Sequence, residues 1–245
     1  MRVAAIWSVL SEPPWPWLIL VSAIGWVVMI GIQTDTTATE LCIAPTGSES
    51  SRFWRNVALS LSQISAIQFL SAWLVMLIAM MTPILANPLC HLWNSSMARR
   101  RRRAIALFLF TYLSVWLLAG LFLVAGTVVL NGLDRVMGWP TGLIALALAL
   151  TWQASPIKQF CLNRCHWLPR LSPLGWAADR DCLRFGLTNA CWCASTCWTL
   201  MMVPLSAGNA HVPAMILVSA VMIVDRLRPA RRPCWQLPPL FRLGY

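Results

Sequence analysis

The sequence predicts an all-α integral membrane protein, a bundle of about six transmembrane helices with both termini in the cytoplasm. Of its 245 residues, 58% are hydrophobic and only 11% are charged, whereas about a quarter of the residues of a soluble domain are charged. The mean hydropathy is +0.66. Apolar stretches near the length of a bilayer span alternate with basic loops, so the composition excludes an ordinary soluble domain.

Six apolar stretches, each bounded by charge, Pro or Gly, are the expected spans. They cover residues 15–32, 64–86, 104–130, 141–157, 187–207 and 212–224. The last is short for a bilayer, a mismatch that tilt of its neighbours or local thinning accommodates. Residues 1–228 are therefore expected to form one six-helix transmembrane domain, and residues 229–245 a Pro/Arg-rich cytoplasmic tail.

The basic residues orient this bundle, because cytoplasmic loops carry an excess of Lys and Arg. With both termini inside, sixteen of the 19 basic residues fall on the cytoplasmic side, and only Arg52, Arg55 and Arg135 fall outside. This asymmetry predicts a protein of the bacterial inner (cytoplasmic) membrane.

The net charge of +11 raises the alternative of a nucleic-acid partner. The positive charge is, however, confined to short loops beside the spans and to the tail, with one run at residues 99–103. Such residues set topology and contact anionic lipid headgroups. The bilayer and its anionic headgroups are thus the expected partners, and no nucleic acid is expected.

Sulfur is concentrated in the second half of the chain. Cys161 and Cys165 are four residues apart, and Cys193, Cys197 and Met201 repeat that spacing, which places side chains on one helix face. Met80 is expected at a comparable depth in the second stretch. Thiolates and thioethers are soft ligands that select Cu(I), zinc or iron-sulfur centres. The candidate metal ligands are Cys161, Cys165, Cys193, Cys197, Met201 and Met80.

Two further points concern these cysteines. Lys158 precedes Cys161 by about one turn if the fourth helix continues, and a nearby lysine favours the thiolate that metals bind. The alternative to a metal site is simple packing, since Cys serves as a small apolar residue and Met fills irregular gaps.

Catalysis is not expected. The sequence contains no paired carboxylates, no Ser/His/Asp set and no phosphate loop, and its three histidines are scattered. The cysteine pairs are spaced Cys-x-x-x-Cys, unlike the Cys-x-x-Cys of thioredoxin-like redox motifs. We therefore expect a protein that is not an enzyme.

Four segments carry a resemblance to a known family. They are SAWLVMLIAMMTPI around Met76, Met80 and Met81, TYLSVW from Tyr112 to Trp116, TWQASPIKQFCLNRCHWLP with Gln153, Lys158, Cys161 and Cys165, and FGLTNACWCASTCWTLM with Gly186, Cys193, Cys197 and Met201. The chain resembles a family of integral membrane proteins of unknown function that are predicted to bind metal and are described as copper chaperones. The resemblance spans most of residues 70–228 and implies a helical membrane protein with a soft-metal site.

The chain departs from the family pattern at two places. The family has adjacent cysteines where this chain has Thr196 and Cys197, and a sulfur-containing pattern after the fifth span where this chain has Asn209, Ala210 and His211. Two functions follow. The first is binding of copper, as Cu(I), for metal trafficking or cofactor assembly. The alternative is a non-catalytic structural or assembly subunit of a larger membrane energy-converting complex, respiratory, photosynthetic or oxygenase. Either function implies a membrane-protein partner or complex.

Overall fold

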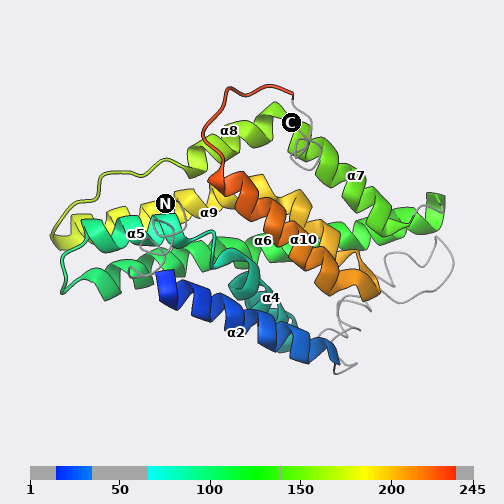
Figure 1. The fold of residues 1–245 in the computed structure, drawn as a ribbon, viewed down its shortest axis with the longest axis horizontal. Coiled ribbons are helices and arrows are strands. Elements are labelled where there is room, and N and C mark those ends of the chain that lie inside the picture. Colours follow the sequence, from blue (N-terminus) through cyan, green and yellow to red (C-terminus); the bar gives the residue numbers. More distant parts are fainter. Residues whose placement is uncertain (1–14, 35–65, 138–139, 236–245) are drawn as a thin grey trace, which may run out of the picture.

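A computed structural model of the chain describes residues 15–34, 66–137 and 140–235 (Figure 1). These residues form eight α-helices and one short 3-10 turn, and no strand occurs among them. The helices are α2 (Trp15–Thr34), α4 (Ala66–Met81), α5 (Ala86–Ser95), α6 (Arg101–Met137), α7 (Thr141–Ala154), α8 (Pro156–Cys165), α9 (Gly175–Leu205) and α10 (His211–Leu227). The all-α prediction is confirmed. The expected outer residues Arg52 and Arg55 and the tail beyond residue 235 lie outside the described residues.

Helices α6 and α9 form the centre of the fold and run in the same direction (Figure 1). Their starts meet where Arg103 pairs with Asp179 at 2.6 Å, and Met202 near the end of α9 lies against Gly126 of α6. Gly186 permits this packing, because a Cβ there would lie 2.5 Å from the carbonyl oxygen of Phe108. The close approach fixes the spacing of the two helices around the site described below.

Two helices end inside stretches that the sequence predicts as continuous spans. Helix α4 ends at Met81, and α5 leaves it at an angle of 79°, in a turn that contains Pro83, which has no N–H for a helical hydrogen bond. Helix α7 ends before Ser155, which is extended (φ −73°, ψ 145°) because a residue that precedes proline is disfavoured in the α region. The Ser155 side chain then caps α8 by accepting the backbone N–H of Lys158 at 3.2 Å.

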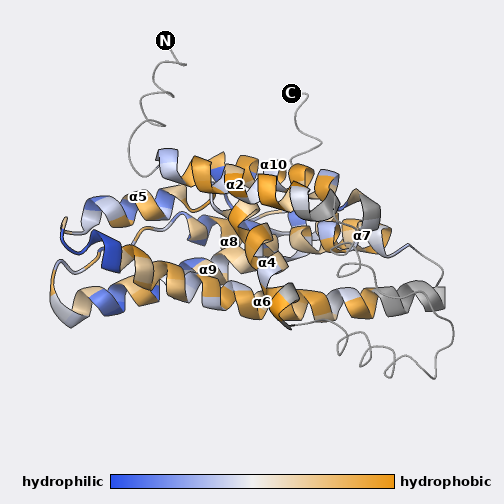
Figure 2. Cartoon of the chain, turned by 90° about the horizontal axis from the view of Figure 1, so that it is seen from below, coloured by the Kyte–Doolittle hydropathy of each residue, from blue (hydrophilic) through white to orange (hydrophobic). Residues whose placement is uncertain are grey.

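Charged residues cluster at the N-terminal ends of α6 and α9. Asp179 accepts from Arg100 and Arg103, and the Arg101 guanidinium lies 4.9 Å from the Trp93 ring centroid. Hydrophilic residues gather at this end, whereas the remaining helices are mostly hydrophobic in colour (Figure 2). Part of the basic run at residues 99–103 therefore has a structural role within the protein.

By length and composition, α6 is the single described helix that can cross a membrane alone, over Arg101–Leu130. The bent pair Phe69–Met81 and Ala86–Ser95 adds a second if it is one broken span, and Trp15–Gly31 and Thr141–Ala154 are shorter apolar helices. Each of the six expected stretches contains a helix. The six-span bundle itself stays a prediction.

Candidate functional site

Three buried cysteines gather between α8 and α9. Cys165 ends α8, while Cys193 and Cys197 lie one turn apart on α9. The thiols of Cys193 and Cys197 lie on one face of α9, as their four-residue spacing allows, and interact with each other. Cys165 and Cys193 line the same cavity and interact electrostatically. We call Cys165, Cys193 and Cys197 the thiol cluster.

Hydroxyl groups on both sides hold the thiol cluster in place. The Tyr112 hydroxyl of α6 donates to Cys193 Sγ at 3.3 Å. Thr196 Oγ1 donates to the Trp192 carbonyl at 2.7 Å and lies 3.6 Å from Cys165 Sγ. Because the threonine proton is used by Trp192, the oxygen is left to accept the Cys165 S–H. Thr196, which stands where the family has a cysteine, therefore contacts the cluster.

Arg226 brings a positive charge to the thiol cluster from α10. Its half-buried side chain lies beside Tyr112, Cys165 and Cys193, with which its positive charge interacts. The ion pairs recorded among the described residues use other cations, since Asp179 pairs with Arg100 and Arg103 and Asp225 pairs with Lys158. A guanidinium stays protonated in proteins, so Arg226 is a permanent cation whose neighbours are weakly acidic thiols and a phenol.

A cavity of about 350 Å³ opens beside the thiol cluster. It lies between α5, α6, α8, α9 and α10, and none of the described residues that line it is Asp or Glu. The lining residues that matter here are Tyr112, Cys165, Cys193, Arg226 and the three asparagines Asn87, Asn94 and Asn189. His91 and His166 also face it, and each ring contacts backbone carbonyls, Pro169 O at 2.8 Å for His91 and Leu162 O at 2.9 Å for His166. The wall thus combines apolar side chains with several polar groups and the permanent positive charge of Arg226.

The other candidate ligands are buried nearby, with different surroundings. Cys161 lies one turn before Cys165 on α8. Met80 and Met201 are fully buried in the same apolar core as Cys193 and Cys197. Within the described residues, no three His, Cys, Asp or Glu side chains converge closely enough to hold a metal ion together. The full ligand set expected from the sequence stays a prediction.

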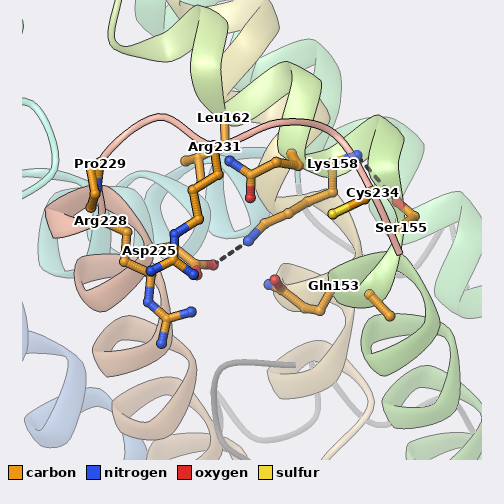
Figure 3. A pocket seen from close by; sticks show the side chains of 11 residues that line it. Gln153, Ser155, Lys158, Leu162, Asp225, Arg228, Pro229, Arg231 and Cys234 are labelled. Carbon is orange, nitrogen blue, oxygen red and sulfur yellow. Dashed lines mark hydrogen bonds and ion pairs between the residues drawn. The ribbon is translucent and has the colours of Figure 1, made fainter. Parts of the chain in front are cut away.

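Lys158 lies one turn before Cys161 on α8, as the sequence suggested, but its ammonium is engaged by a carboxylate. Its ammonium pairs with the Asp225 carboxylate at 2.7 Å, and both side chains are about 95% buried (4% and 5% exposed). Figure 3 shows Lys158 reaching Asp225, with Gln153 pointing toward the same space. The cavity there is only about 20 Å³. The first residues of the tail pass over it, where Asn163 Nδ2 donates to the Arg231 carbonyl at 2.7 Å.

The sequence places Asp225 and Arg226 at the inner end of the sixth stretch, where they can pair or extend toward the membrane surface, but it does not identify their partners. The available signal was their charge inside an otherwise apolar stretch, because ionisable residues in such stretches pair with each other or mark a function. Tyr112 was noted only within the family resemblance. Nothing local to its segment indicates a contact with Cys193, which is 81 positions away.

The fold and this site define a class of protein: an all-helical chain with a buried thiol cluster that adjoins a basic cavity. The pattern of the copper chaperone family PpoB2 matches residues 70–243, which is most of the chain and includes the thiol cluster, Tyr112 and Arg226. The chain belongs to this family, as the resemblance of its segments had indicated. No curated protein and no solved structure matches the chain.

Proposed function

We propose that the protein binds Cu(I) as its cargo through the thiol cluster and passes it on for metal trafficking or cofactor assembly. The observation that carries this proposal is that Cys165 and Cys193 line one cavity, with Cys197 one turn beyond Cys193, in a member of a copper chaperone family. Soft thiolates select Cu(I) over harder cations. A cluster with a cavity on one side keeps one face open, as a site that releases its cargo requires.

Arg226 supports this proposal through charge. Thiols bind metal as thiolates and release their protons, and two thiolates around one Cu(I) leave a net negative charge. A buried charge is costly unless it is paired and hydrogen-bonded. Arg226 lines the same cavity as Cys165 and Cys193, so the compensating charge is present before the metal arrives.

The remaining members of the expected ligand set keep secondary places in the proposal. Met201 follows Cys197 by one turn, and Met80 shares the same buried core. A thioether from either would complete the coordination of a copper held by two cysteines. Cys161, one turn from Cys165, is proposed as the next thiol along α8. The family also points to a role that is not catalytic.

A membrane setting is the second part of the proposal. Large apolar side chains are exposed on helices from all six expected spans, and exposed apolar surface on this scale marks an interface with lipid or protein. Examples are Val27 (70% exposed), Ile67 (79%), Phe122 (77%), Leu143 (57%), Leu187 (48%) and Ile216 (55%). We propose that this surface faces the inner-membrane bilayer, and that a membrane protein receives the copper.

The test is the copper content of the purified full-length protein, loaded with Cu(I) under anaerobic conditions in detergent. We expect bound copper in the natural chain and its loss in Cys165→Ser and Cys193→Ser. Cys182→Ser is the matched control, because Cys182 is also a buried thiol of α9 but lies beside Asp179. Absence of copper from the natural chain, or equal copper in Cys193→Ser, would overturn the proposal.

A further inference from the structure

The cavity beside the thiol cluster has a charge that does not suit a free metal cation. Arg226 places a permanent positive charge in its wall, and the lining contributed by the described part of the chain has no Asp or Glu. Charges interact strongly where water is excluded, and a cleft lined by one sign of charge concentrates ligands of the opposite sign. Free Cu⁺ that enters this cavity is therefore repelled on its way to Cys165 and Cys193.

The size and polar groups of the cavity fit a small organic anion. A volume of about 350 Å³ lies within the range of roughly 300–1,000 Å³ typical of small-molecule sites. A guanidinium binds carboxylates through two parallel hydrogen bonds. Asn87, Asn94 and Asn189 also line the cavity, and their side-chain amides can donate further hydrogen bonds.

We propose that the cavity receives copper as an anionic complex of Cu(I) with a small thiol that carries carboxylates, and that Arg226 binds this complex. This inference rests on the proposed function, because it names the form in which the cargo reaches the thiol cluster. The expected topology places the cavity toward the cytoplasmic end of the bundle. Glutathione, a thiol of this class, keeps that compartment reduced.

The transfer is a ligand exchange without electron transfer. Each copper–sulfur bond to the incoming thiolate breaks as a bond to a cysteine sulfur forms, and the cysteine proton passes to the departing thiolate, which leaves as a neutral thiol group. Copper stays Cu(I) throughout. A copper with two thiolates carries a single negative charge before and after the exchange, so the same guanidinium of Arg226 compensates it in both states.

The experiment compares two copper sources for the full-length protein in detergent, the anionic Cu(I)–glutathione complex and the cationic acetonitrile complex of Cu(I). Loading is followed by stopped-flow absorbance of the copper–thiolate bands. Arg226→Gln should slow loading from the glutathione complex by about tenfold more than it slows loading from the acetonitrile complex, since a charge that steers a ligand acts mainly on association.

Arg228→Gln is the matched control, because it removes the same charge two residues away, at the small cavity over Lys158. It should load like the natural chain from both sources. S-methylglutathione, which carries the carboxylates but no free thiol, should compete with the glutathione complex for the natural chain. This competition does not depend on a variant, so it decides the matter even if Arg226→Gln fails to fold.

The outcomes separate the two proposals. Copper uptake from both sources with no competition by S-methylglutathione, or equal slowing of both sources in Arg226→Gln, would overturn the anionic carrier while the copper-binding function stands. No uptake from either source would overturn the function itself. Selective slowing with competition supports both.

Discussion

Two neighbouring residues of α10, Asp225 and Arg226, belong to different polar sites: a closed ion pair and an open cavity. Asp225 faces α8 and pairs with Lys158 at 2.7 Å, in a space of about 20 Å³. Arg226, the next residue along, lines a cavity of about 350 Å³ together with Cys165 and Cys193. The ion pair has its counter-charge within the protein, whereas Arg226 has thiols that become anions when they bind metal.

This difference shows how one turn of helix can combine structure with function. A buried ion pair whose partners are both present adds no binding capacity, and it mainly penalises loss of either partner. Arg226 has no carboxylate partner among the described residues, so its guanidinium can still bind an anion. We therefore expect changes at Lys158 and Asp225 to alter folding, and changes around Arg226 to alter copper binding first.

The largest effect is expected from Lys158→Met. It leaves the Asp225 carboxylate buried without its cation, and breaking such a pair typically costs about 3–5 kcal/mol. Chemical unfolding of the detergent-solubilised protein should show this loss. The double variant Lys158→Met with Asp225→Leu should recover most of it, because apolar side chains can replace a buried pair at little cost. A single variant as stable as the natural chain would contradict a closed ion pair.

A smaller loss of stability is expected from Gly186→Ala, which changes the packing of α6 against α9 beside the thiol cluster. The added Cβ would meet the Phe108 carbonyl oxygen at 2.5 Å, and overpacking of this kind costs about 1–3 kcal/mol. It should also separate Tyr112 from Cys193 and weaken copper binding. Gly31→Ala is the control, since nothing lies within 4 Å of its added Cβ. Equal stability of the two variants would argue against the close contact of α6 and α9.

Tyr112→Phe should have a still smaller effect on stability. It removes only the hydroxyl that donates to Cys193 Sγ at 3.3 Å, and one hydrogen bond contributes about 0.5–1.5 kcal/mol. Its copper affinity, measured by competition with a chromophoric Cu(I) chelator, should change. Ser114→Ala removes an exposed hydroxyl of the same helix and should leave the affinity as it was. Identical affinities for Tyr112→Phe and the natural chain would remove Tyr112 from the site.

The half-buried carboxylate of Asp181 provides a comparison for the contribution of the buried Lys158–Asp225 pair to stability. The Ser172 backbone N–H and hydroxyl donate to the Asp181 carboxylate at 3.0 Å and 2.6 Å, which lowers the pKa of Asp181. Its contribution to stability is therefore present above the ordinary carboxyl pKa of about 4 and is lost as pH falls through the lowered value. Asp181→Asn should flatten this part of the stability–pH curve slightly. A curve that keeps its full slope would assign the acid loss to other groups.

The helices could be predicted well from the sequence and the polar contacts only in part. Apolar runs between basic loops located all six main helices, and the spacing of Cys193 and Cys197 placed both thiols on one face. The bend at Ser155 was available from Pro156, because a residue before proline avoids the helical region. The partner of Lys158 could not be predicted from the sequence. Cys161 follows it by one helical turn, whereas its partner Asp225 is 67 positions away. The place of Arg226 depends on the same docking of α10 against α8.

The central claim is that copper is held by the sulfurs of the thiol cluster. X-ray absorption at the copper edge of the loaded full-length protein tests it most directly, with Cys193→Ser and Cys182→Ser measured beside it. We predict reduced copper with a sulfur-only first shell in the natural chain and in Cys182→Ser, and loss of sulfur scattering in Cys193→Ser. A shell of nitrogen and oxygen, or a spectrum unchanged by Cys193→Ser, would contradict the claim.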